Sequence, residues 1–228
     1  MPSDADIIAG QIAPYREQLA DADAIVFVGG TDHNLDCEGR DRTSMQFPQG
    51  QTELIRQVSA INGKTIVVLM HGAPIDLPWI DRVPAVLDMF FPGMEGGTAM
   101  ADILFGDADP SGRLTFSWPE RLEDSPVYEL ATQDVDNVNY EDSLMVGYRY
   151  FDTKRVTPRY EFGYGLSYTT FDYSKMKVKK DGDNCVVTLH VKNTGSRDGA
   201  EVVQIYVGQK NCRYTRPVHE LKAFDKVF

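Results

Sequence analysis

Two continuous apolar runs separated by one helical pattern constrain the fold of this chain more than any other feature. The runs are Ala24–Val28 and Thr65–Met70, and apolar residues at helical spacing lie between them over 54–61. Continuous apolar runs are typical of strands that are buried on both faces of a parallel sheet. A third run within 83–91 and a helical pattern over 93–105 continue the alternation. The first part of the chain is therefore predicted to be an α/β sandwich, with a mainly parallel sheet flanked by helices.

The hydrophobic period changes towards the C-terminus. Residues 186–192 alternate between polar and apolar, and the run Val202–Val207 follows a turn signal at Asn193–Ser196. This pattern predicts an all-β sandwich of the immunoglobulin or fibronectin kind, which needs about seven strands and about 100 residues. Because too little chain follows to complete such a sandwich, this domain is expected to be incomplete and truncated.

The expected organisation has three parts. An α/β sandwich domain covers 1–119, a connector covers 120–171, and the truncated all-β domain covers 172–228. The connector is polar and acidic up to about residue 139 and aromatic-rich from there on. We interpret its rings as packed under the connector or between domains, with a platform for stacking on sugars as the open alternative.

The charge and the cysteines exclude some classes of function. Acidic residues number 34 and basic residues 23, giving a formal net charge of -11. This balance argues against nucleic acid or an anionic membrane as a partner, because both require a basic footprint. No apolar run approaches the roughly 18 residues of a membrane span. Cys37, Cys185 and Cys212 lack the spacing of a zinc site or a disulfide framework, and no metal or cofactor is expected.

The loop that follows the first apolar run is the candidate functional element. It leaves the strand at Gly29 and meets no helical pattern until about Gln51. Loops of this length are uncommon in compact domains, and ligands bind at the carboxyl ends of strands in open α/β sheets. We interpret it as a catalytic loop whose central residue is Glu38.

Five sequence blocks occur in the order and spacing of one enzyme family. The sequence resembles the C-terminal half of a family 3 glycoside hydrolase of the β-glucosidase or β-xylosidase type, and the resemblance covers nearly the whole chain. The blocks are Cys37–Arg42, Phe91–Gly97, Ile103–Leu114, Val146–Asp152 and Phe162–Phe171.

The resemblance implies an enzyme of three parts. An N-terminal (β/α) barrel carries an aspartate nucleophile, an α/β sandwich carries the acid/base glutamate, and a fibronectin type III-like domain follows. The barrel is missing from this chain. The acid/base position falls on Glu38, with Asp41 and Arg42 following as the family pattern requires and Cys37 where serine is more usual. Asp41 and Arg42 are expected to support the loop as a pair.

The chemistry of retaining glycoside hydrolysis agrees with this placement. It needs one carboxyl group to attack the anomeric carbon and another, about 5 to 5.5 Å away, to protonate the leaving oxygen and later activate water. We therefore expect a retaining enzyme that acts on a β-linked glucoside or oligosaccharide once this chain is joined to the barrel. The fragment alone is expected to be inactive. Sugar specificity, a possible homo-oligomeric state and the compartment are left open by the sequence, and no substrate-binding residue is singled out.

Parts of the sequence also resemble other kinds of functional site. Asp32, Asn34 and Asp36 begin like a calcium loop, but Cys37 occupies the position that requires glycine. A cysteine nucleophile would need His33 or His71 beside Cys37. The run Gly163–Tyr168 lacks the third glycine of a dinucleotide loop. The remaining alternative is a non-catalytic module that binds carbohydrate or docks onto a barrel.

Overall fold

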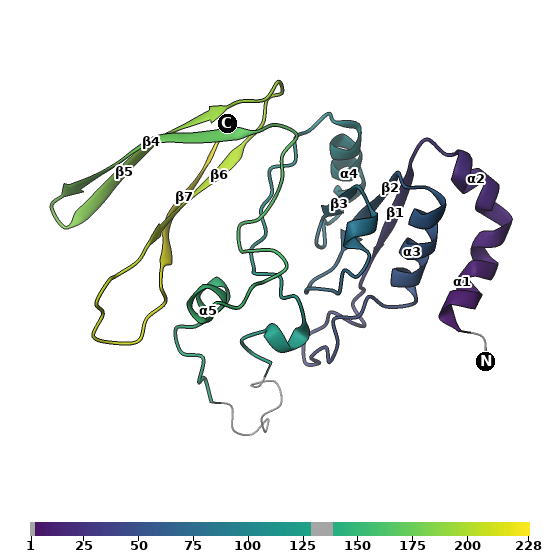
Figure 1. Ribbon diagram of the computed structural model, residues 1–228, viewed down its shortest axis with the longest axis horizontal. Coiled ribbons are helices and arrows are strands. Elements are labelled where there is room, and N and C mark those ends of the chain that lie inside the picture. Colours follow the sequence, from purple (N-terminus) through teal and green to yellow (C-terminus); the bar gives the residue numbers. More distant parts are fainter. Residues whose placement is uncertain (1–2, 129–138) are drawn as a thin grey trace. The chain divides into compact units, whose positions relative to one another are not determined.

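The computed structural model describes residues 3–128 and 139–228, which form two compact units (Figure 1). The described residues of unit 1 are 3–100 and 120–128, and those of unit 2 are 101–119 and 139–228. Half of the polar stretch predicted as a connector, 129–138, lies outside the described residues. The domain limits at 119 and 171 stay a prediction, because each compact unit combines two separate stretches of the chain.

Unit 1 contains the predicted parallel sheet. Its strands are β1 (Ile25–Gly30), β2 (Thr65–Met70) and β3 (Ala85–Asp88), hydrogen-bonded in the order β1-β2-β3. Both pairs are parallel, with Val28 beside Val68 and Val68 beside Leu87. This confirms the predicted fold class, because parallel neighbours require the helical crossovers that the sequence pattern contains.

Helices precede and link these strands. The chain begins with α1 (Asp4–Ile12), η1 (Ala13–Tyr15) and α2 (Arg16–Asp21), and α3 (Gln51–Ile61) connects β1 to β2. Ile8, Ile12 and Val58 form a buried cluster between α1 and α3. Two further short elements of unit 1 are η2 (Ile80–Arg82) and η3 (Leu122–Asp124), and α4 (Gly96–Phe105) contains the unit boundary.

The two faces of β1 differ in their exposure to solvent, which the sequence did not predict. Ile25 and Phe27 are half-buried, whereas Val26 and Val28 are 44% and 45% exposed. The expectation that this strand is buried on both faces is therefore wrong for the described residues. The reason is that the packing of β1 against α1, α3 and Phe47 uses only one face in the described part of the chain.

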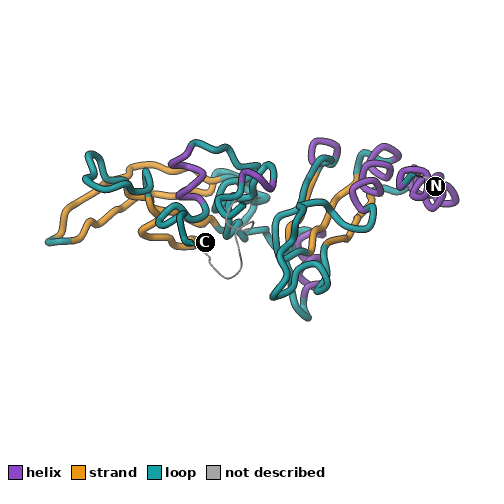
Figure 2. The backbone as a smooth tube through the Cα atoms, turned by 90° about the horizontal axis from the view of Figure 1, so that it is seen from below, coloured by secondary structure: helices purple, strands orange, loops and turns teal. Residues whose placement is uncertain are grey.

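Unit 2 contains two antiparallel ribbons, which can be followed in Figure 2. One pairs β4 (Phe171–Asp181) with β5 (Asn184–Asn193), and the other pairs β6 (Glu201–Val207) with β7 (Glu220–Val227). Each has one shift of register, as a β-bulge produces. They agree with the predicted fibronectin type III-like sandwich in its incomplete form.

The aromatic-rich stretch packs on itself within unit 2. It contains the helix α5 (Tyr148–Lys154), which the sequence analysis did not predict. The Tyr148 ring lies 5.2 Å from Phe162 and 5.5 Å from Tyr206, while Tyr160 stacks on Tyr164 at 4.7 Å. The rings therefore serve as a small aromatic core between α5 and the strands. No helix in the described part of the chain is both long and apolar enough to cross a membrane.

Candidate active site

Three loops of unit 1 leave the carboxyl ends of the parallel strands. They span 31–50 after β1, 71–79 after β2 and 89–95 after β3. Because parallel strands point the same way, these loops meet at one edge of the sheet, where open α/β sheets bind ligands. The candidate glutamate lies in the first loop, and its supports come from the second.

Local packing fixes the point where the first loop leaves β1. The Gln51 amide accepts a hydrogen bond from Gly30 N at 3.0 Å and donates one to Gly30 O at 2.9 Å. A side chain at Gly30 would overlap the carbonyl oxygen of Met70, so only glycine fits there. The end of β1 is thus held from both sides, between Met70 and Gln51.

Glu38 lies at the tip of a tight turn. Cys37 and Arg40 form an isolated antiparallel bridge, and Gly39 between them has a φ of 79°. A positive φ at the third residue of a turn favours glycine, which explains the Glu-Gly pair. Glu38 is exposed, and within residues 3–128 and 139–228 its carboxyl group makes no hydrogen bond or ion pair. It can therefore accept a contact from a bound molecule without losing one.

Asp36 is the most connected residue of the loop. Its carboxylate accepts hydrogen bonds from the Thr31 hydroxyl and from Gly72 N, the latter at 2.9 Å. Its side chain is only 8% exposed. Burial alone would raise the pKa of Asp36, but the hydrogen bonds from Thr31 and Gly72 and the charge of Arg42 together lower it below the usual range. The group is therefore a carboxylate near neutral pH.

Arg42 faces Asp36 across the turn. Arg42 Nη1 lies 3.5 Å from Asp36 Oδ1, 3.4 Å from Ala73 O and 3.4 Å from Pro74 O. The charge partner of Arg42 in the described part of the chain is thus Asp36, whereas Asp41 is exposed and not joined to Arg42. The predicted pairing of Arg42 with Asp41 is therefore not seen in the described residues, and Asp36 takes that place, with no sequence signal beyond its position two residues before Glu38.

The loop after β2 is itself fixed by a buried histidine. His71 is fully buried, with Nδ1 2.9 Å from Ala73 O and Nε2 3.1 Å from Asp88 Oδ1 at the end of β3. His33 instead lies against the Phe91 ring at 6.0 Å. In the described part of the chain no hydrogen bond joins either imidazole to the exposed Cys37 thiol, so the geometry gives no support to a cysteine nucleophile.

The structure also gives no support to a metal loop. Asp32 accepts a hydrogen bond from Asn34 N at 2.9 Å, and Asp36 is bound as described above. The described residues contain no group of three or more histidine, cysteine or acidic side chains arranged to hold a metal ion.

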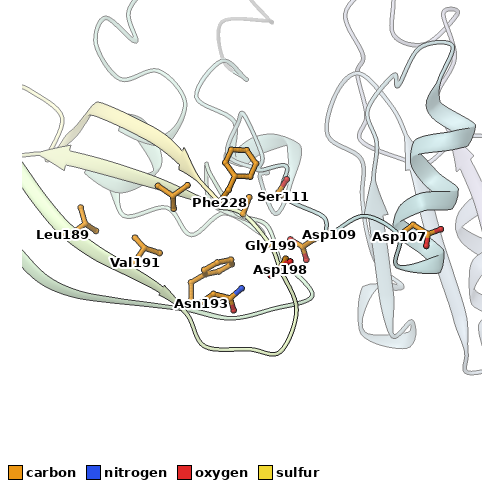
Figure 3. A pocket seen from close by; sticks show the side chains of 12 residues that line it. Asp107, Asp109, Ser111, Leu189, Val191, Asn193, Asp198, Gly199 and Phe228 are labelled. Carbon is orange, nitrogen blue, oxygen red and sulfur yellow. The ribbon is translucent and has the colours of Figure 1, made fainter.

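One hollow lies beside the loop in unit 1, and another lies in unit 2. The smaller, of about 250 Å³, adjoins the loop and is lined by the end of β1, Met70 and Gln51. The larger, of about 840 Å³, lies in unit 2 between the ribbons and mixes acidic with apolar side chains (Figure 3). None of the residues 31–50 lines it.

Comparison with known proteins agrees with this geometry. Residues 9–168 match the family described as Glycosyl hydrolase family 3 C-terminal domain, and residues 201–228 match the Fibronectin type III-like domain. The chain is 41% identical to the beta-glucosidase BoGH3A of Bacteroides ovatus over 221 residues, which is 92% of this chain and 30% of the relative.

Solved structures give the same result. The beta-glucosidase of Bifidobacterium adolescentis, described as GH3, superimposes with a TM-score of 0.92 at 36% identity, covering 100% of this chain and 34% of that one. The beta-glucosidase of Kluyveromyces marxianus, solved in complex with glucose, gives 0.90 at 37% identity, covering 96% and 26%.

An α/β sandwich with a loop-borne glutamate, followed by fibronectin-like ribbons, is a module of glycoside hydrolases. This chain belongs to the glycosyl hydrolase family 3, whose C-terminal domain it contains. It spans about 30% of the length of the relatives that it matches.

Proposed function

We propose that this chain supplies the acid/base glutamate, Glu38, of a retaining β-glucosidase whose nucleophile lies on a (β/α) barrel. The observation that carries the proposal is the placement of Glu38, which is exposed at the tip of a turn that contacts hold on both sides. This turn lies at the ligand-binding edge of a parallel sheet. Arg42 supports the loop through Asp36 and the carbonyl groups of 73–74. A supporting role for Asp41 is proposed from the family resemblance alone, since Asp41 is exposed and not joined to Arg42 in the described part of the chain.

Glu38 acts twice in the proposed reaction. While the barrel carboxylate attacks the anomeric carbon, Glu38 gives its proton to the glycosidic oxygen, so that the bond to the leaving group breaks with an alcohol as product. Glu38 is then a carboxylate and takes a proton from the water that attacks the glycosyl-enzyme, which releases the sugar and regenerates both groups. The surroundings of Glu38 suit this role, since its carboxyl group is not held by any described neighbour.

A β-linked glucoside is the proposed substrate. The relatives at 36–41% identity are named beta-glucosidases, and one of them was solved with glucose. The barrel is the proposed partner, because one carboxyl group cannot complete a retaining double displacement.

The test is the variant Glu38→Ala in an enzyme that joins this chain to a family 3 barrel. We expect kcat on an aryl β-glucoside to fall about 100- to 10,000-fold, the range for loss of a general acid/base group. Azide should restore part of the rate on a substrate with a good leaving group, because it replaces the water that Glu38 no longer activates.

Two controls accompany this variant. Glu17→Ala, which removes an exposed glutamate on α2, should leave the rate unchanged. The isolated chain should show no hydrolysis. Near-normal activity of Glu38→Ala would contradict the acid/base assignment and favour a non-catalytic module that binds sugar or docks onto the barrel.

A further inference from the structure

We infer that Asp36 is the positioning residue of this site. By binding Thr31, Gly72 and Arg42, it holds the turn that carries Glu38 in one position relative to the sheet. This inference rests on the proposed function of Glu38. It adds a residue that was expected neither to support the loop nor to take part in the reaction.

The contacts of Asp36 join three separate parts of unit 1. Thr31 is the first residue of the loop, Gly72 follows β2, and Arg42 lies on the far side of the turn. The bond between Asp36 and Gly72 N spans 36 positions of sequence, so it fixes the loop relative to the sheet and not merely to itself. Glu38 lies between Asp36 and Arg42 in the sequence. Its backbone cannot move far while Asp36 stays bound to Gly72 N and Arg42 stays beside Asp36.

The relative strength of the contacts identifies Asp36 as their centre. The bond from Gly72 N is 2.9 Å long, whereas the contacts of Arg42 are 3.4–3.5 Å long, beyond the usual range of hydrogen bonds. Arg42 therefore acts mainly as a charge beside a nearly buried carboxylate. Removing Asp36 would break the hydrogen bond from Gly72 N and leave the Arg42 guanidinium without its charge partner.

The packing around Gly72 is shaped for this contact. A Cβ at Gly72 would lie 2.9 Å from the Phe91 ring and 3.4 Å from the Asp36 side chain. Gly72 thus lets the backbone of the second loop approach Asp36 closely, with Phe91 on the other side. A side chain at this position would press first on the Phe91 ring and would fill the space between Phe91 and Asp36.

The first experiment uses this chain alone. Hydrogen exchange measured by NMR at the Gly72 amide reports opening of its bond to Asp36. We expect Asp36→Ala to speed this exchange about tenfold or more, which corresponds to loss of a hydrogen bond to a charged group. Asp23→Ala, which removes an exposed carboxylate before the start of β1, is the matched control and should leave it unchanged. Equal exchange in Asp36→Ala and the unsubstituted chain would overturn the inference.

The second experiment uses the barrel-joined enzyme and two substrates. Proton donation by Glu38 matters for methyl β-glucoside, whose leaving group is poor, and hardly at all for dinitrophenyl β-glucoside. If Asp36 positions Glu38, Asp36→Ala should lower kcat/KM about 10- to 100-fold on the methyl glucoside and by less than about threefold on the dinitrophenyl glucoside. A general loss of folded enzyme would lower both values alike, and that result would overturn the positioning role.

A milder variant keeps the test decisive if Asp36→Ala folds poorly. Thr31→Val removes one donor to Asp36 at nearly constant volume and should shift both readouts in the same direction by a smaller factor. No shift in either readout would count against the inference.

The inference and the proposed function fail separately. If Glu38→Ala keeps its activity, the acid/base assignment is wrong, and the exchange at Gly72 still shows whether Asp36 holds the loop. If Glu38→Ala behaves as an acid/base variant but Asp36→Ala affects both substrates equally, only the positioning role is wrong.

Discussion

Strands β2 and β4 both pair with neighbouring strands, β4 with one shift of register, but they differ strongly in burial. Val67, Val68 and Leu69 of β2 are at most 1% exposed, whereas every residue of β4 after Phe171 is exposed. An isolated two-stranded ribbon is at best marginally stable in water, because pairing alone buries little apolar surface. Hydrogen bonds therefore pair both strands with their neighbours, whereas burial of apolar side chains stabilises β2 and not β4.

Polar contacts join segments of unit 2 that are far apart in sequence. Asp109 accepts hydrogen bonds from the Ser167 hydroxyl at 2.9 Å and from Tyr168 N at 2.7 Å. Arg113 lies 3.2 Å from Glu201 of β6, with both side chains largely buried. These contacts join the segment after α4 to the residues just before β4 and to the first residue of β6. Unit 2 is thus expected to respond more to loss of one of these polar side chains than to loss of an exposed apolar side chain on β4.

The largest expected effect is in the buried sheet. Leu69→Ala removes a side chain from the centre of β2 and should lower the free energy of unfolding of unit 1 by about 2–5 kcal/mol. Leu166→Ala, at a leucine that is 72% exposed, is the matched control and should change stability by less than about 0.5 kcal/mol. Hydrogen exchange resolved by peptide separates the two units. Equal effects of both variants would contradict the contrast in burial.

The next effect concerns the polar contacts of unit 2. Asp109→Ala should destabilise unit 2 by about 1–3 kcal/mol, since Tyr168 N and the Ser167 hydroxyl lose their charged acceptor. Exchange in peptides from 101–119 and 160–200 should rise while β2 stays protected. Ser167→Ala removes one of the donors and should have a smaller effect. If β2 exchanged faster as well, the two units would not be independent.

The smallest effect is a dependence on pH at the sheet edge. Because the folded-state pKa of Asp36 is lowered, its contribution is present above the unfolded value of about 3.9 and is lost as the pH falls through the folded value. The stability difference between the unsubstituted chain and Asp36→Ala, about 1 kcal/mol near neutrality, should therefore shrink below pH ~4. Urea midpoints measured across this range test it, and a difference independent of pH would contradict an ionised Asp36.

The sequence predicted the elements whose signals are local and repeated. The three strands of unit 1, the helix after the loop and the start of that helix at Gln51 are confirmed, because apolar periodicity and flanking glycines encode them. It also predicted which loop carries Glu38, since a long polar excursion after a buried strand has few structural explanations. The chemical role of Glu38 stays a prediction.

The features that were missed depend on contacts distant in sequence. Helix α5 is short, rich in aromatic residues of modest helix propensity, and begins after Gly147 without a side-chain cap, so only packing against Phe162 and Tyr206 identifies it. The exposure of Val28 depends on which strands and helices flank β1. The pairing of Arg42 with Asp36 depends on the course of the loop around Gly72, which no spacing rule contains.

The side chain of Gln51 has a further consequence for the outer border of the sheet. Within the described residues β1 is an edge strand, and the N–H and C=O of Gly30 both bond to Gln51 while Thr31 N bonds back to Met70. Gln51 thus occupies the place that the backbone of another strand would take. Exposed edges recruit foreign strands and promote aggregation, and natural sheets obstruct them. A single glutamine therefore closes β1 to an incoming chain at the end where the loop begins.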